Sequence, residues 1–255
     1  MCVVAFGWDA HPRWRLVLAG NRDEFHARPT APLARWDDGS GIIAGRDLEA
    51  GGTWLGVAPG GRCALVTNVR DLRLRQDGAS RGLLASDWLR GGSGATGHAR
   101  ALLAGAGGYR PFNLLLADRD DAAWATNARP ARMSAIEPGV HVLSNAALDT
   151  PWPKADTLGV CLQAWLGAGI DDDFEPLFSA LADEHTWPDA RLPDTGVGLE
   201  RERLLSAAFI RGDSYGTRAS TVVALDRSGG GVIIERRWGA SGAALGQARQ
   251  ELAAA

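Results

Sequence analysis

The sequence predicts an α+β fold in which helices cover antiparallel sheets. Three observations lead to this prediction. Short apolar runs come in pairs around turn residues, as at residues 2–8 and 14–20. The clearest pair, STVVALDRSGGGVIIERRW at residues 220–238, surrounds a glycine-rich turn. Helical patterns occur in blocks rather than after each strand, so a regular βαβ repeat is not indicated.

The first seventy residues are predicted to be mostly strand and loop. CVVAFGW, a DAHP break and WRLVLAG read as an N-terminal hairpin, because apolar and β-branched residues flank a polar cluster that contains proline. GIIAG, GTWLGVA and RCALVTN are three further apolar runs separated by glycine-rich turns. We expect these three runs to form a meander that continues the same sheet.

Helices are expected after this sheet. Residues 81–90 place leucines and a tryptophan at helical spacing, and residues 97–105 contain good helix formers. FNLLLADRDDAAWATN then predicts strand, turn and strand, and GVHVLSN predicts one more strand.

The last third of the chain is predicted to return to helix before the final hairpin. Residues 155–183 and 198–210 have helical patterns, and residues 253–255 read as a frayed tail. We find no repeat, no low-complexity linker and no domain boundary. Residues 1–255 are therefore expected to form a single domain.

Composition limits the class of partner. The 255 residues are 45% hydrophobic and carry a formal net charge of −3, so bulk charge gives no indication of nucleic-acid binding. The sequence contains no run of about 18 apolar residues, the length that a membrane-spanning helix requires. The expected partner is a small-molecule substrate or ligand, and the oligomeric state is left open.

Three cysteines, at positions 2, 63 and 161, form neither a CxxC pair nor a metal-ligand spacing. A sparse, odd number of cysteines suits a reducing compartment, so we expect a cytoplasmic protein. No HExxH motif or clustered His and carboxylate spacing is present, and we expect neither a metal site nor a required cofactor.

Cys2 is the first residue with a chemical signature. Its small side chain permits removal of Met1, which would leave a thiol and a free α-amine on one residue. Such an amine, with a pKa of about 8, can act as general base toward its own thiol. A buried structural cysteine in a first strand is the alternative interpretation.

A polar cluster, Asn21-Arg22-Asp23-Glu24, follows the second strand of the hairpin that begins at Cys2. Hairpin geometry should bring this cluster back toward the start of the chain. A carboxylate there could hold the α-amine, and a guanidinium could favour the thiolate. A solvated charged turn is the alternative, but the preceding strand is strongly apolar.

These features together resemble the NRDE family, also called the transport and Golgi organisation protein 2 type. The resemblance rests on MC at the start, NRDEF after the second strand, GTWLG, and Ser80-Arg81-Gly82, and it spans essentially the whole chain. It implies a fold like that of the N-terminal-nucleophile (Ntn) hydrolases, an αββα sandwich of two antiparallel sheets flanked by helices. Eukaryotic members of the family are linked to haem and lipid handling.

A more distant resemblance is to the N-terminal-cysteine amidases, the choloylglycine hydrolase and penicillin V acylase group. Their nucleophile corresponds to Cys2, and their arginine and aspartate after the second strand correspond to Arg22 and Asp23. The local order differs, since the amidases have G-R-N-x-D where this chain has G-N-R-D-E. Asn21 or Glu24 could therefore fill one of these roles instead.

Three later positions complete the resemblance to the amidases. Their oxyanion-hole asparagine resembles Asn68 in ALVTN, and their second asparagine resembles Asn145 in HVLSN. Their late arginine resembles Arg218, just before the strand TVVAL. An asparagine N–H is a competent oxyanion donor, although asparagine is also common after strands because it tolerates turns.

The resulting hypothesis is an Ntn-type hydrolase of a linear, non-peptide amide. Cys2 attacks, Asp23 orients its amine, Arg22 and Arg218 stabilise charge near the thiol, Asn68 and a backbone N–H hold the oxyanion, and Asn145 positions substrate or amine. The rival is a carrier on the same fold that binds haem, an acyl-CoA or another lipid. Beyond Asn68, a basic stretch is expected to be a solvated loop, although it could meet an anionic ligand group; it contains Arg70, Arg73 and Arg75.

Overall fold

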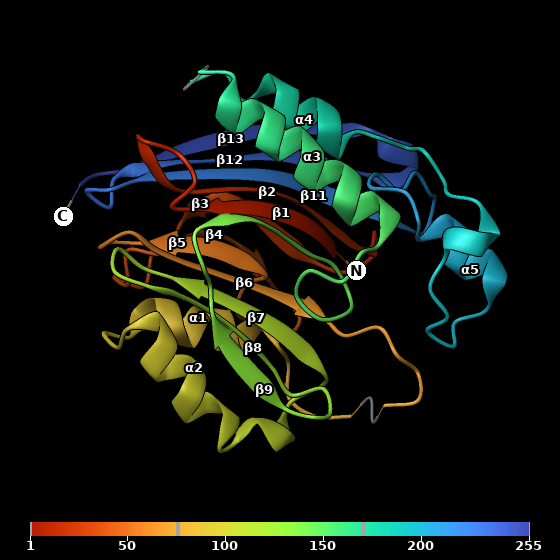
Figure 1. Cartoon of the computed structure of the whole chain (residues 1–255), viewed down its shortest axis with the longest axis horizontal. Coiled ribbons are helices and arrows are strands. Elements are labelled where there is room, and N and C mark those ends of the chain that lie inside the picture. The colour runs from red at the N-terminus through yellow and green to blue at the C-terminus, as the bar shows by residue number, and fades with distance from the viewer. Residues whose placement is uncertain (1, 75–76, 170–171, 255) are drawn as a thin grey trace.

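Four layers make up the molecule: two antiparallel sheets face each other, and helices cover the outer face of each sheet (Figure 1). The computed structural model describes residues 2–74, 77–169 and 172–254, and all elements given below lie in these ranges. The predicted αββα sandwich is confirmed.

The first sheet contains both ends of the described chain. Within the described residues it has six strands in the order β10-β1-β2-β11-β12-β13, all antiparallel to their neighbours. Its strands are β1 (Cys2–Trp8), β2 (Trp14–Phe25), β10 (Gly139–Leu143), β11 (Tyr215–Asp226), β12 (Gly231–Trp238) and β13 (Ala244–Leu252). The N-terminal hairpin and the late hairpin are thus adjacent, because β2 pairs with β11.

The second sheet is built from the middle of the chain. In the described residues its seven strands follow one another in chain order, from β3 to β9. Its strands are β3 (Thr30–Arg35), β4 (Ile43–Asp47), β5 (Leu55–Ala58), β6 (Arg62–Asn68), β7 (Phe112–Ala117), β8 (Ala122–Thr126) and β9 (Arg132–Ala135).

One expectation about this sheet was wrong: the meander of β4, β5 and β6 does not continue the sheet of the N-terminal hairpin. The reason lies in β2, whose two edges are occupied by β1 and β11. A following strand has no edge of β2 to pair with, so the chain crosses after Phe25 and starts a second sheet.

Two pairs of helices cover the sheets. In Figure 1, α1 (Gly82–Arg90) and α2 (Ala95–Leu103) lie on the second sheet, and α3 (Pro153–Gly167) and α4 (Glu175–Leu181) on the first. A short helix, α5 (Leu199–Leu204), lies beside the layers. Single 3₁₀ turns occur at Ala106–Gly108, Asp189–Arg191 and Ala240–Gly242.

The late helices are shorter than predicted. The expected helix at 155–183 is two helices, and residues 170 and 171 of that range lie outside the described residues. The expected helix at 198–210 ends at Leu204. Beyond it, the carbonyl groups of Leu205 and Ala207 accept hydrogen bonds from the Lys154 side chain instead of continuing the helical ladder.

Hydrophobic side chains fill all three spaces between the layers. Alternate residues of β1 face opposite ways: Val4 and Phe6 pack between the sheets, whereas Val3 and Ala5 pack against the helices. The same alternation determines to which face of the sheet each polar side chain in these strands points.

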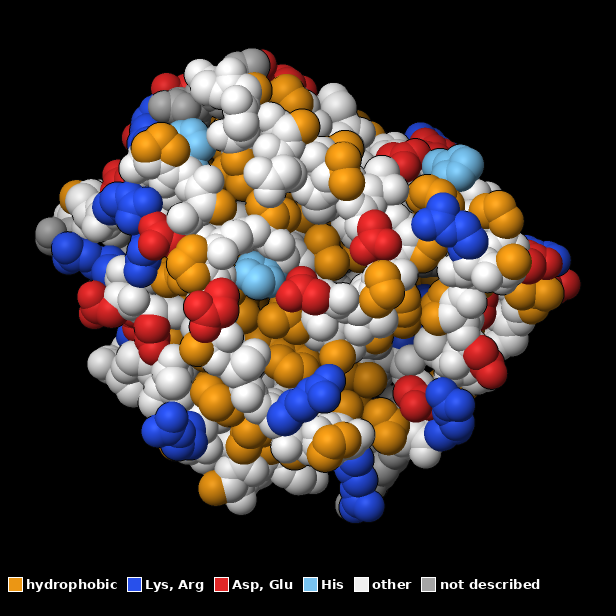
Figure 2. Space-filling model, viewed as in Figure 1, with side chains coloured by type: hydrophobic (Ala, Val, Ile, Leu, Met, Phe, Trp, Pro, Cys, Tyr) orange, Lys and Arg blue, Asp and Glu red, His pale blue; other side chains and the backbone are white. Residues whose placement is uncertain are grey.

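The surface is mixed in character. On the face shown in Figure 2, acidic and basic side chains are interspersed among scattered hydrophobic ones. No helix in the described part of the chain is long and apolar enough to cross a lipid bilayer.

Candidate active site

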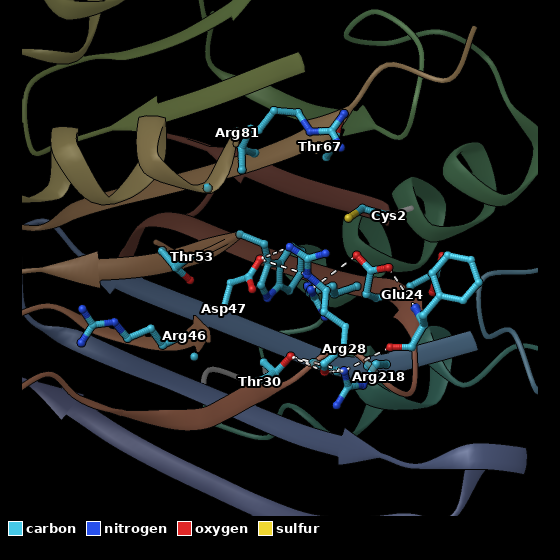
Figure 3. Close-up of a pocket in the computed structure, with 18 of the residues that line it drawn as sticks. Cys2, Glu24, Arg28, Thr30, Arg46, Asp47, Thr53, Thr67, Arg81 and Arg218 are labelled. Atoms are coloured by element: carbon cyan, nitrogen blue, oxygen red, sulfur yellow. Dashed lines mark hydrogen bonds and ion pairs between the residues drawn. The ribbon is translucent and has the colours of Figure 1, made fainter. Parts of the chain in front are cut away.

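Cys2 is the first residue of β1 and continues the series of Val4 and Phe6, so its side chain faces the space between the sheets. There the thiol lines a cavity of about 390 Å³ to which both sheets and the start of α1 contribute (Figure 3). The residue is 6% exposed. Burial raises the pKa of the Cys2 thiol, Asp23 raises it further and Arg22 lowers it.

The polar cluster lies beside the start of the chain, as hairpin geometry predicted, but it forms part of β2 instead of following the second strand. Arg22 is directly opposite Cys2 in the register of β1 and β2. Because residues two apart share a face, Arg22 and Glu24 point to the same side as Cys2, and they form an ion pair of 3.6 Å. Arg22, Asp23 and Glu24 all line the cavity.

Asn21 faces the opposite side of the sheet. Its amide Nδ2 donates hydrogen bonds to the carbonyl oxygens of Leu181 and Ala208, at 2.7 and 2.8 Å. Asn21 is fully buried in these contacts and is not among the described residues that line the cavity. Its structural task is to fasten the end of α4 and the segment after α5 to β2.

Asp23 is also buried, at 1% exposure, and accepts a hydrogen bond of 2.8 Å from the Thr217 hydroxyl of β11. Burial raises the pKa of Asp23, and the positive charge of Lys154 acts in the opposite direction. Asp23 is one residue beyond Arg22, the register partner of Cys2, and by the alternation of β2 its side chain shares a face with that of Asn21. Its expected role toward the Cys2 amine stays a prediction.

Lys154, near the start of α3, is a buried charge that sequence reasoning missed; it is not among the described residues that line the cavity, but it acts on the pKa of Asp23. It is 3% exposed, and its Nζ donates to the carbonyl oxygen of Leu205 at 2.9 Å. Burial lowers its pKa to about 8, against the opposing effect of Asp23. Nothing in the local sequence distinguishes it from a solvated lysine in the first turn of a helix.

Asn145 connects Cys2 to Asn68. Its Oδ1 accepts a hydrogen bond of 3.4 Å from the Cys2 backbone N–H, and its Nδ2 donates to Asn68 Oδ1 at 2.9 Å. Since the Oδ1 of Asn68 is occupied in this way, its Nδ2 donors are the atoms available to the cavity that Asn68 lines. The neighbouring Ser144 hydroxyl donates to the Cys2 carbonyl at 2.8 Å.

Arg218 occupies a β-bulge. The pairing of β2 with β11 shifts between Thr217 and Ala219, and the extra residue is Arg218. Its guanidinium donates to the carbonyl groups of Phe25 and Arg28 and to the Thr30 hydroxyl. Although Arg218 lines the cavity, these contacts tie the β2–β3 connection to β11, and Figure 3 shows it at the end away from Cys2.

The basic stretch beyond Asn68 differs from the expected solvated loop. Arg70 is 6% exposed, stacks on Trp152 and forms an ion pair of 2.8 Å with the buried Glu202 of α5. Arg73 is exposed and pairs with Asp71, and Arg75 lies outside the described residues. Arg70 therefore fixes α5 to the end of β6.

Other charged groups surround the cavity. Arg28 pairs with Asp47 at 2.8 Å, and Glu235 accepts a hydrogen bond of 2.9 Å from the backbone N–H of Leu33. Burial raises the pKa of Glu235. Among the described residues, no group of three or more His, Cys, Asp or Glu side chains is arranged to hold a metal ion.

The same fold is found in solved structures. One is a Caenorhabditis elegans ortholog of N-acylethanolamine-hydrolyzing acid amidase, with a TM-score of 0.52 and 13% identity over 89% of this chain and 93% of that chain. Another is the C2A mutant of the conjugated bile acid hydrolase from Clostridium perfringens, with a TM-score of 0.51 and 8% identity over 93% of this chain and 89% of that chain. The fold is that of the Ntn hydrolases.

The chain belongs to the transport and Golgi organisation 2 family, whose model matches residues 1–240. Similar proteins include the transport and Golgi organization protein 2 homologs of Bos taurus and Homo sapiens, with 32% and 31% identity over 92% of each chain. The Drosophila melanogaster protein is 26% identical over 89% of this chain and 88% of its own. The resemblance read from the NRDE segment is confirmed.

Proposed function

We propose that the protein is an N-terminal-cysteine amidohydrolase that cleaves a linear, non-peptide amide with Cys2 as nucleophile after removal of Met1. The observation that carries the proposal is the chain of contacts from the Cys2 nitrogen through Asn145 to Asn68, next to a thiol that faces the cavity. These contacts support the proposal because they bring together the groups that would act as nucleophile, base and oxyanion donor.

The proposed reaction begins with transfer of the thiol proton to the Cys2 α-amine. Because burial raises the pKa of the thiol, it needs this base at neutral pH. The sulfur then forms a bond to the amide carbon, and the Nδ2 of Asn68 donates to the oxyanion. As the C–N bond breaks, the α-ammonium returns the proton to the leaving nitrogen.

Water completes the cycle by attacking the thioester while the α-amine accepts its proton. The carboxylic acid leaves, and the thiol is restored. In this scheme Asp23 orients the amine, Arg22 opposite Cys2 favours the thiolate, and Asn145 positions the amine and the Asn68 amide. These chain residues supply every step.

A carrier of haem, an acyl-CoA or another lipid would use the same cavity. Among the described residues that line it, Cys2 is the only side chain of the types that commonly ligate haem iron. In the hydrolase the Cys2 thiol must react with the substrate, whereas in the carrier it would only contact the bound ligand.

Substitution of Cys2 separates the two functions. Cys2→Ala should abolish turnover of N-acyl amides by the purified protein, and Cys2→Ser should reduce it severely, whereas Cys161→Ser on α3 should leave it unchanged. Turnover is measured as release of the free amine. Activity of Cys2→Ala equal to that of the wild type would contradict nucleophilic catalysis. Saturable binding of a lipid ligand without turnover in any variant would favour the carrier.

A further inference from the structure

The cavity carries an excess of positive charge. Seven arginines and four carboxyl groups line it among the described residues. Two of these carboxyl groups already accept hydrogen bonds from the protein, Asp23 from the Thr217 hydroxyl and Glu235 from the Leu33 N–H, and burial raises the pKa of both. Arg22 and Arg28 are balanced by Glu24 and Asp47. The remaining arginines make the space favourable for an anion.

Arg81 is the member of this group that is both half-buried and close to the thiol. Figure 3 shows its side chain reaching over the cavity toward the end at which Cys2 and Thr67 lie. Burial lowers the pKa of Arg81, the charge of Arg110 lowers it further, and Cys2 raises it. Arg81 and Cys2 therefore interact electrostatically across the space that a substrate would occupy.

The guanidinium of Arg81 has capacity for a ligand. Its Nη1 donates to the carbonyl oxygen of Pro111 at 3.1 Å. In the part of the chain that the structure describes, no carboxylate lies within ion-pair distance of Arg81 or of the exposed Arg110. A half-buried guanidinium with one neutral acceptor retains donors that favour a carboxylate or phosphate.

The backbone at Arg81 is held in place by a glycine contact. Gly52 has φ +74°, and a Cβ there would meet the carbonyl carbon and oxygen of Gly82 at 2.4 Å. The neighbouring Thr53 N–H donates to the Gly82 carbonyl at 3.2 Å. The GTWLG and Ser80-Arg81-Gly82 motifs are thus in contact beside the cavity. This contact fixes the backbone position from which the Arg81 side chain extends.

We propose that Arg81, assisted by Arg110, binds an anionic group of the substrate, a carboxylate or a phosphate, beside the bond that Cys2 attacks. This inference deepens the proposed function, on which it rests for the position of the amide. It assigns the substrate class: N-acyl compounds that carry a negative charge near the amide. Neutral N-acyl amines would lack this contact.

Binding to the Cys2→Ala protein tests the inference without turnover. The probes are N-decanoylglycine, its neutral N-methylamide, and decyl phosphate, titrated by calorimetry at low ionic strength. One charged hydrogen-bonded contact is worth roughly a tenfold to hundredfold change in affinity, so we expect one or both anions to bind at least about tenfold more tightly than the neutral amide. The stronger of the two anions identifies carboxylate or phosphate as the preferred group.

Variants at Arg81 then assign the contact. In the Cys2→Ala background, Arg81→Gln should remove the preference for anions, Arg81→Lys should keep part of it, and Arg100→Gln on the exposed face of α2 should leave it unchanged. Equal affinity for charged and neutral probes, or an anion preference that survives in Arg81→Gln, would overturn the inference. Absence of amide turnover by the wild type, with the Arg81-dependent preference intact, would reject the hydrolase and leave the anion site standing.

Discussion

At the scale of single residues, Asn145 determines how two other groups are oriented. Its Oδ1 faces the Cys2 nitrogen and its Nδ2 faces Asn68 Oδ1, so one amide sets the direction of both. Neither contact follows from sequence spacing, because the residues are far apart along the chain and meet only when β1, β6 and the segment after β10 pack together.

Asn145→Asp should separate positioning from packing. The carboxylate has nearly the same shape and still accepts from Cys2, but it cannot donate to Asn68. We expect kcat to fall by roughly a hundredfold, the size of effect seen when one oxyanion donor is lost, with a smaller change in KM. Steady-state kinetics on an N-acyl substrate give the result. Asn127→Asp, away from the cavity, is the control, and unchanged kcat in Asn145→Asp would contradict the assigned role.

Lys154 gives a prediction about pH. Its pKa in the folded protein, about 8, lies below its ordinary value of 10.5, so the unfolded state binds more protons between these two values. Lys154 therefore makes the free energy of unfolding rise with pH across this window, by up to roughly 3 kcal/mol at about 1.4 kcal/mol per pKa unit.

Comparison with Lys154→Met isolates this effect from other titrating groups. Urea denaturation of both proteins at pH 7.5 and pH 10.5 gives the difference in unfolding free energy, wild type minus variant. That difference should be larger at the higher pH. If it is constant or shrinks, Lys154 does not have a lowered pKa in the fold.

At the scale of elements, the strands that were not predicted lie at sheet edges. β3 and β9 are the two edges of the second sheet, and β13 is an edge of the first. Their sequences, TAPLAR, RMSA and ALGQARQEL, are short or polar and one contains proline. Polar residues and proline at a sheet edge discourage pairing with another chain. A strand of this composition lacks the alternation of apolar residues by which a strand is predicted from sequence.

Another element-level feature is the contact of Gly52 with Gly82 at the start of α1. Gly52→Ala should destabilise the protein by roughly 2–5 kcal/mol, because left-handed backbone strain adds to the clash with Gly82. Gly60→Ala is a matched control, since Gly60 also has positive φ (+81°) but nothing within 4 Å of a Cβ. It should cost about 1 kcal/mol from strain alone.

Thermal and urea denaturation of the two glycine variants check this prediction. Equal losses would show that the Gly82 contact does not matter. The anion preference at Arg81 should also weaken in Gly52→Ala and not in Gly60→Ala, because the first substitution displaces the backbone that carries Arg81.

At the scale of the whole molecule, the sequence predicted the layers of the fold and the proximity of Cys2 and Arg22. Cys2 and Arg22 were predictable because a hairpin is local and its register follows from the turn. The crossing to a second sheet was not predictable, since it depends on β11 occupying the free edge of β2 from nearly two hundred residues away.

The charged groups that were missed have a common cause. Lys154 and Arg70 are buried by segments distant in sequence. Arg81 can be recognised as a candidate binding residue only once the cavity that it lines is known. Sequence patterns assign lysine and arginine to solvent because most are exposed. Tertiary packing decides which charged side chains are buried. Buried charges with shifted pKa values are frequent at functional sites.

The most direct test of the central claim is mass spectrometry of the wild-type protein quenched in acid during turnover of N-decanoylglycine. We expect Met1 to be absent and a decanoyl group to be attached to Cys2 as a thioester that hydroxylamine releases. Retention of Met1 on active protein, or turnover with the acyl group attached to another residue, would contradict it.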